Sequence, residues 1–236
     1  MMNINQFEHL LVSELQDIIE NIINDHQYLS ISAKTRVGSE ISAWLEEKFV
    51  EYTQEHQYFQ DSEACPKGKT KNPWDARTFF SIDSIQEEIW IDFKAIKIEQ
   101  LDSNPDIGTP NKIIEFILSG NFYLIYIYVY YSSLDSGLKF EKIDNLSCKV
   151  YLLKDISSTV RRNPKNQLQV NISASIEYRT RRDFIALLTQ KLEESYKRQI
   201  EKSQKELELL ETKKISLMNA NKESESKLRS KLERLD

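Results

Sequence analysis

Two short segments in the first half of the chain alternate between apolar and polar residues, with only a few polar residues between them. Small or apolar side chains recur at every second position of each segment: Ala76, Thr78, Phe80 and Ile82, then Ile89, Ile91, Phe93 and Ala95. Side chains of a β-strand switch faces at each residue, so this period predicts two half-buried strands. We therefore expect an antiparallel hairpin that reverses near Ser84 and places one face in the core.

The register of this hairpin decides which polar residues meet. A turn centred between Ser84 and Ile85 makes the two apolar faces coincide, whereas a slip by one residue would turn Asp75 to the wrong face. Opposed side chains on one face lie roughly 5 Å apart at Cβ. The expected opposed pairs on the polar face are Asp75 with Lys94, and Arg77 with Asp92.

Two carboxylates and an ammonium group therefore converge on the polar face of the predicted hairpin. Magnesium prefers oxygen ligands and often binds only one or two protein carboxylates, together with phosphate and water. Asp75, Asp92 and Lys94 are thus candidates for a site that holds a divalent cation and an activated water. The alternative is that they are exposed charges on an ordinary hairpin.

These residues resemble a known motif. The segments Pro73-Trp74-Asp75 and Asp92-Phe93-Lys94 look like the signature of the PD-(D/E)XK nuclease superfamily, with Trp74 inserted between the usual Pro and Asp. The resemblance covers chiefly residues 35–131. It implies an α/β fold with a mixed central β-sheet flanked by helices, as in type II restriction endonucleases.

The resemblance also implies a role for each residue of the motif. Asp75, Asp92 and the carbonyl of Phe93 would bind Mg²⁺, and Lys94 would orient and help to deprotonate the attacking water. Many such nucleases carry a further glutamate on the helix before the first catalytic strand, and Glu40 is the candidate here. The alternative for Glu40 is that it only complements the helix dipole, which favours acidic residues in the first turn.

Composition narrows the remaining classes. The chain has 236 residues, a formal net charge of −5 and two cysteines, which give neither a metal-binding spacing nor a disulfide framework. No basic leader is visible, and the longest apolar run, residues 122–131, is too short to span a bilayer. We expect a cytoplasmic protein without a membrane partner. Net charge averages over regions, so local basic clusters decide whether the chain binds nucleic acid.

Helical periodicity and one apolar run complete the predicted fold. Apolar residues at helical spacing predict helices near residues 7–23, 35–52 and 111–119, and the run 122–131 predicts a strand covered on both faces at the centre of the sheet. We expect a nuclease domain over residues 1–190, with its catalytic core at about 35–131, a basic strand-loop region at 149–182, and a helical extension over 191–236.

Basic residues gather at two places that could contact DNA. One is a polar loop before Asp75 and the other is a loop that we expect to join two strands, within a region of eight lysines and arginines against two acids. Phosphate contacts position a protein on a duplex, whereas Arg, Asn and Gln can read base edges. Solvated loops are the alternative. The candidate DNA-binding residues are Lys67, Lys69, Lys71, Arg77, Arg161, Arg162, Asn163, Lys165, Asn166 and Gln167.

Two further segments, Pro105-Asp106 and the C-terminal tail, carry recognisable patterns. Pro105-Asp106 is a literal Pro-Asp, but it lies after Asp92-Phe93-Lys94, so we expect a structured turn there. The tail has an interrupted heptad pattern, which predicts a weak coiled coil that serves as a dimer contact or as an arm on the first helix. Its apolar heptad positions are Ile200, Leu207, Leu210, Leu217, Leu228 and Leu235.

The function that these residues favour is magnesium-dependent hydrolysis of phosphodiester bonds in double-stranded DNA at a short specific sequence. A homodimer is expected, since two-fold protein symmetry matches a palindromic site. Two alternatives stay open. One is a repair or recombination nuclease of the same superfamily, and the other is a non-catalytic DNA-binding or coiled-coil assembly protein.

Overall fold

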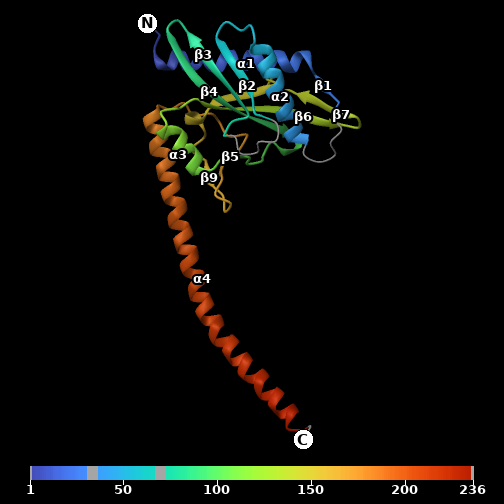
Figure 1. Cartoon of the computed structure of the whole chain (residues 1–236), viewed down its shortest axis with the longest axis vertical. Coiled ribbons are helices and arrows are strands. Elements are labelled where there is room, and N and C mark those ends of the chain that lie inside the picture. Colours follow the sequence, from blue (N-terminus) through green and yellow to red (C-terminus); the bar gives the residue numbers. More distant parts are fainter. Residues whose placement is uncertain (1, 31–36, 67–72, 235–236) are drawn as a thin grey trace. The chain divides into compact units, whose positions relative to one another are not determined.

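The computed structural model describes residues 2–30, 37–66 and 73–234 of the chain (Figure 1). Helices and strands follow one another in the order α1 (Ile4–Asp25), β1 (Tyr28–Leu29), α2 (Val37–Thr53), β2 (Phe59–Ala64), β3 (Ala76–Ile82), β4 (Ile85–Lys97), η1 (Ile98–Gln100), β5 (Asp106–Gly108), α3 (Pro110–Leu118), β6 (Leu124–Leu134), β7 (Gly137–Glu141), β8 (Cys148–Leu152), η2 (Leu153–Asp155), β9 (Arg161–Arg162), β10 (Leu168–Gln169) and α4 (Arg181–Leu232).

A seven-stranded mixed sheet forms the centre of the molecule. Its order is β1-β7-β6-β4-β3-β2, with β8 paired to the first half of β6. Strands β4 and β6 run parallel, and the other described neighbours in this sheet are antiparallel. Residues 124–131 of β6 are all buried, as expected for a strand covered on both faces. The predicted fold class, a mixed central sheet flanked by helices, is confirmed.

The hairpin of β3 and β4 forms as expected, but its predicted register is wrong by two residues. Ile82 lies opposite Ile85, so the turn consists of Asp83 and Ser84 alone. Asp83 adopts φ 53°, a left-handed conformation that aspartate tolerates better than most residues. The turn is centred one residue earlier than predicted, and moving the centre by one residue changes the pairing of the strands by two. Because side chains alternate with a period of two, every residue keeps its predicted face.

Helices α1 and α2 cover one face of the sheet (Figure 1). The apolar stripe of α1 and residues Ile41, Leu45 and Phe49 of α2 are buried against the inward side chains of β3, β4, β6 and β8. Each fully buried aliphatic or aromatic side chain contributes about 1.5–3 kcal/mol relative to its exposed state. This layer fixes the backbone of β3 and β4, and it leaves Asp92 and Lys94 on the opposite face.

The opposite face carries a cluster of buried tyrosines beneath a small second sheet of order β5-β10-β9. Tyr126, next to Asp92 in the β4–β6 pair, donates a hydrogen bond from its hydroxyl to Ile107 O of β5 at 2.6 Å. The hydroxyl of Tyr151 donates to that of Tyr128 at 3.0 Å. The Tyr126 bond ties β5 of the small sheet to the large sheet beside Asp92, and the Tyr151 bond joins β8 to β6.

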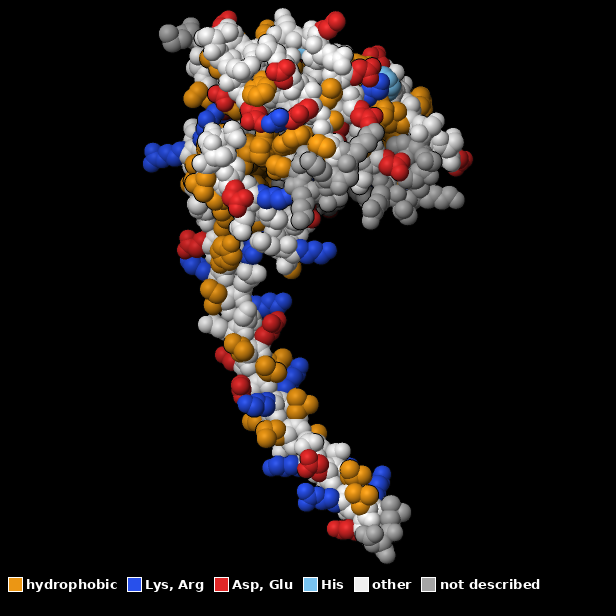
Figure 2. Space-filling view, viewed as in Figure 1, with side chains coloured by type: hydrophobic (Ala, Val, Ile, Leu, Met, Phe, Trp, Pro, Cys, Tyr) orange, Lys and Arg blue, Asp and Glu red, His pale blue; other side chains and the backbone are white. Residues whose placement is uncertain are grey.

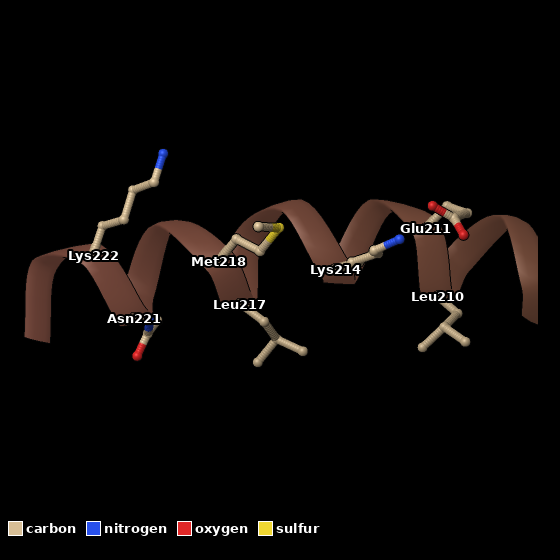
Figure 3. Close-up of a pocket in the computed structure, with 7 residues that line it drawn as sticks. All are labelled: Leu210, Glu211, Lys214, Leu217, Met218, Asn221 and Lys222. Carbon is tan, nitrogen blue, oxygen red and sulfur yellow. The ribbon is translucent and has the colours of Figure 1, made fainter. Parts of the chain in front are cut away.

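Residues Leu188–Asp236 form a second unit, which is the main part of α4. Every described residue from 196 to 234 is exposed, and charged side chains of both signs alternate with hydrophobic ones along the helix (Figure 2). Leu210 and Leu217 point to the same side, and Asn221 continues that side one turn later (Figure 3). The hollow in this view is lined by α4 alone. The predicted helix is therefore present, and its role as a coiled coil stays a prediction.

None of the helices in the described part of the chain combines the length and the apolar character that crossing a membrane requires.

Candidate active site

Asp75, Asp92 and Lys94 come together where β3 begins and β4 continues past it. The backbone N–H of Asp75 donates to Ile91 O at 2.9 Å, which extends the β3–β4 pairing by one residue. Asp75 therefore lies level with Asp92, and not opposite Lys94 as the sequence predicted. Lys94 Nζ forms an ion pair with Asp92 Oδ1. The three side chains share the polar face that the alternation predicted.

A backbone hydrogen bond locks the first carboxylate onto the second strand. Phe93 N–H donates to Asp75 Oδ2 at 2.8 Å. At this point β3 has ended, so the N–H that would pair with another strand pairs with a side chain instead. The bond holds the Asp75 carboxylate beside the peptide that joins Asp92 to Lys94. This bond fixes the Asp75 carboxylate, and the ion pair with Asp92 places Lys94.

The carboxyl groups of Asp75 and Asp92 lie close together in a half-buried site, and both have raised pKa values. Burial raises the pKa of Asp75 to about 6, and the charge of Asp92 adds to the shift. Burial also raises the pKa of Asp92, in spite of the opposing attraction of Lys94. For Lys94 burial lowers the pKa, but the nearby carboxylates outweigh it, so the net shift is upward. Both carboxylates would gain from a further positive charge.

Helix α2 supplies a glutamate that sequence reasoning missed. Burial raises the pKa of Glu46 to about 7, and the second cause is the charge of Asp75, so the two carboxylates are close. The expected glutamate, Glu40, is exposed in the first turn of α2. Glu46 follows the buried Leu45 and precedes the exposed Glu47. The sequence does not say which of these glutamates faces the sheet, because that depends on how α2 packs.

The carbonyl of Phe93, the third expected ligand, lies at the same end of the hairpin. Ser42 Oγ lies 3.1 Å from Phe93 O and 3.1 Å from Gly38 O, so its single hydrogen is shared between two acceptors. A carbonyl oxygen has two lone pairs, so Phe93 O keeps capacity for another partner.

The donor set fits a hard divalent cation. Asp92 Oδ1 is buried and, within the described chain, receives no hydrogen bond of good geometry; its neighbour is the Lys94 ammonium group. Among the described residues, no three His, Cys, Asp or Glu side chains gather closely enough to hold a metal by themselves. Asp75, Asp92 and the Phe93 carbonyl offer oxygen atoms only, which suits Mg²⁺ better than a softer metal.

Asp106 lies between this cluster and the loop of the small sheet. It begins β5, and its charge contributes to the raised pKa of Lys94. Asp106 Oδ1 accepts hydrogen bonds from Asn163 Nδ2 at 3.1 Å and from Gln169 Nε2 at 2.8 Å. The structured turn expected at Pro105-Asp106 is not found there, because Asp106 begins strand β5; its hydrogen bonds connect the β9–β10 hairpin to the face that bears Lys94.

The predicted recognition loop is the tip of the β9–β10 hairpin, although Arg161 and Arg162 belong to β9 itself. Side chains of the loop form hydrogen bonds within the loop itself. Asn163 Oδ1 accepts from the N–H groups of Lys165 and Gln167, and Asn166 Oδ1 accepts from Arg162 Nε. The outward cations are Arg161 and Lys165, which are exposed.

Several other basic residues serve internal contacts. Lys149 Nζ donates to two backbone carbonyls at 2.6 and 2.9 Å, and Arg181 donates to the hydroxyl of Tyr123 at 2.8 Å. Arg77 lies opposite Trp90, not Asp92, and pairs with Glu63 at 2.5 Å and Glu88 at 3.3 Å. The excess of positive charge over residues 149–182 therefore overstates the surface available to DNA. Lys67, Lys69 and Lys71 lie outside the described residues.

Comparison with known proteins identifies the family. A model of the SwaI-like family, described as SwaI restriction endonuclease, matches residues 3–210, which is most of the chain. No curated protein matches the chain. The family match includes the Asp75–Asp92–Lys94 cluster, helix α2 and the β9–β10 hairpin. The chain belongs to the SwaI-like family of restriction endonucleases, and is thus a DNA-binding nuclease.

Proposed function

We propose that this chain is a type II restriction endonuclease that hydrolyses phosphodiester bonds of double-stranded DNA at a short specific sequence, with Mg²⁺ as cofactor and PD-(D/E)XK chemistry. The observation that carries the proposal is the meeting of Asp75, Asp92 and Lys94 on one polar face, with Asp75 held by Phe93 N–H at 2.8 Å. The enzyme would act in the cytoplasm.

Asp75, Asp92 and the Phe93 carbonyl would hold the cation, and Glu46 is the best placed side chain to join them by a rotation. A bound Mg²⁺ supplies a Lewis acid for the phosphate and a more acidic water. The side chains at this site favour the binding of a cation. The two raised carboxylate pKa values show that negative charge here lacks compensation, so a divalent cation has a favourable place to bind.

Lys94 would position the attacking water and, once its own proton has passed to solvent, help to deprotonate that water. Its ammonium group is now paired with Asp92, and a cation bound to Asp92 would weaken that pair. Lys94 would then turn toward the water while Asp92 stays with the cation. Positioned general acid–base groups contribute about 10²–10⁴-fold to a rate.

DNA would lie across the face that carries the cluster and the β9–β10 hairpin. We propose that Arg161 and Lys165 contact phosphates or bases there, and that Arg162, Asn163, Asn166 and Gln167 shape and support the loop. Lys67, Lys69, Lys71 and Arg77 remain proposed contacts with the DNA backbone. A homodimer would present two such sites to a palindrome, and the exposed heptad face of α4 is a candidate for its contact.

Incubation of the purified full-length chain with unmethylated duplex DNA and Mg²⁺ tests the proposal. Discrete fragments, lost in the Asp92→Ala variant and in excess EDTA, are the expected result. Random nicking would favour a repair or recombination nuclease, and binding without cutting would favour a non-catalytic protein. Sequencing the fragment ends would then give the recognition sequence and the cut positions.

A further inference from the structure

A second cluster of charged residues lies around a cavity of about 510 Å³. The cavity is lined by α1, by the end of β8 with η2, and by residues 178–183, which lead into α4. Its volume falls in the range of small-molecule sites, about 300–1,000 Å³. None of its lining residues belongs to the Asp75–Asp92–Lys94 cluster.

The two cations that line this cavity, Lys154 and Arg179, are bound to internal acceptors. Lys154 Nζ lies 3.1 Å from Glu8 Oε2, donates to Asp155 Oδ1 at 2.8 Å and donates to the backbone carbonyl of Arg179 at 2.7 Å. An ammonium group has three hydrogens, and all three have partners here. The Arg179 guanidinium donates to the backbone carbonyls of Lys154, Ile156 and Glu177, and it pairs with the Glu177 carboxylate.

One acceptor remains without a partner. The side chain of Glu8 is only 7% exposed, and its Oε1 is buried with no hydrogen bond among the described residues. An unpaired buried acceptor costs about 1–3 kcal/mol, and more when the group is charged. Burial raises the pKa of Glu8, against the attraction of Lys154 and Arg181. Glu8 Oε1 is therefore an acceptor that lacks a donor among the described residues. A ligand with an N–H group would supply that donor, whereas an anion would not.

The walls add an apolar lining and an aromatic ring. Val12 and Leu152 line the cavity, and Tyr178 stands at it with 80% of its surface exposed. Asp155 and Asp183 bring further negative charge to the same cavity. Carboxylates beside an aromatic ring attract organic cations, since the ring face is electronegative.

We infer that this cavity binds a small organic cation, a primary alkylammonium with a short apolar stem, whose N–H donates to Glu8 Oε1. The stem would pack on Val12 and Leu152, and Tyr178 would cover the entrance. Because Glu8 lies on α1 and Tyr178 lies just before α4, the bound cation would join the two chain segments. This site is independent of the proposed cleavage chemistry.

Calorimetric titration of the full-length chain with n-butylammonium chloride tests the inference. We expect saturable binding with a Kd of about 1 mM or tighter, and none with n-butanol, which keeps the stem and lacks the charge. The Glu8→Gln variant should bind at least tenfold more weakly. The matched control is Asp17→Asn, which removes one carboxylate from the exposed side of the same helix and should leave the affinity unchanged.

A second variant keeps the test decisive if Glu8→Gln does not fold. Tyr178→Ala alters an exposed side chain, so the protein should fold normally, and its affinity for n-butylammonium should fall several-fold. The inference is overturned if the wild-type chain does not bind n-butylammonium. It is also overturned if n-butanol binds equally well, or if Tyr178→Ala and every folded Glu8 variant bind with wild-type affinity.

Discussion

Two clusters in this molecule contain the same charged groups, two carboxylates and one lysine, and differ in how those groups are used. Asp75, Asp92 and Lys94 lie on the polar face of the β3–β4 hairpin, and the Lys94 and Asp92 side chains are 28% and 21% exposed. Glu8 of α1 and Lys154 and Asp155 of η2 form the second cluster, with side chains only 4–7% exposed.

The difference lies in the lysine. Lys154 is held by three partners at 2.7–3.1 Å, and one of them, the carbonyl of Arg179, belongs to the backbone and has a fixed position. Within the described part of the chain, Lys94 forms its ion pair with Asp92, and its side chain is partly exposed. A lysine bound on all sides ties chain segments together. One with a single flexible partner can change partners when substrate and metal arrive.

The comparison predicts that removing the two lysines has different effects. Lys94→Ala should lower the cleavage rate by about 10²–10⁴-fold, because it removes the group that positions the water. Its melting temperature should stay close to that of the wild type, since the side chain is partly exposed. Single-turnover cleavage assays and thermal unfolding of the same preparation measure both. A variant that cuts at the wild-type rate would remove Lys94 from the mechanism.

Lys154→Ala should act on stability instead. It leaves two buried carboxylates without their cation, and breaking a buried ion pair in this way costs about 3–5 kcal/mol. Chemical denaturation should therefore show a large loss in the free energy of unfolding. Where the variant is still folded, the rate of its cleavage step should match that of the wild type. Unchanged stability would mean that the Glu8–Lys154 contact does not stabilise the fold.

The two glutamates of α2 give the next, smaller contrast. Glu46→Gln should raise the Mg²⁺ concentration needed for half-maximal cleavage by about 10–100-fold, a typical cost for losing a group that supports a metal site. Glu40→Gln should behave like the wild type, because Glu40 is exposed at the start of the helix. Mg²⁺ titrations of cleavage rate compare the two. The reverse result would assign the role to Glu40, as the resemblance first suggested.

The sequence predicted the candidate site because faces are easier to infer than registers. Alternation placed Asp75, Asp92 and Lys94 on one polar face, and an error of two residues in the pairing did not change that. The error arose in the turn, since sequence alone did not reveal that Asp83 would take a left-handed conformation. Strand β2 was not predicted, because an edge strand with one exposed face carries few apolar residues.

The sequence could not show which charged side chains bind partners inside the protein and which are available at its surface. Counting lysines and arginines over residues 149–182 suggested a broad basic surface, but Lys149, Lys154 and Arg179 are turned to internal acceptors. Glu46 and Glu8 are two of many helical glutamates, and only packing shows that each faces other charges. Such long-range partners leave no local periodicity to detect.

The smallest effect concerns the stability of the active-site cluster itself. The pKa of Asp75 is raised from 3.8 to about 6 in the folded chain. Between these values the folded chain holds a proton that the unfolded chain has lost, so this group stabilises the fold most below about pH 4. That contribution falls as the pH rises and is gone above about pH 6. At neutral pH the burial of the Asp75 charge, and its repulsion from Asp92, oppose folding.

Asp75→Asn should therefore stabilise the protein at pH 8 while it abolishes cleavage. We expect about 1 kcal/mol after allowing for solvent screening, or a rise of about 2–4 °C in Tm, and no gain at pH 4. Thermal unfolding across pH 4–8 without divalent cations measures it, with Asp17→Asn as the control for loss of an exposed charge. Destabilisation at pH 8 would mean that the hydrogen bond from Phe93 N–H needs the full charge of Asp75, and that the cluster is not held under electrostatic strain.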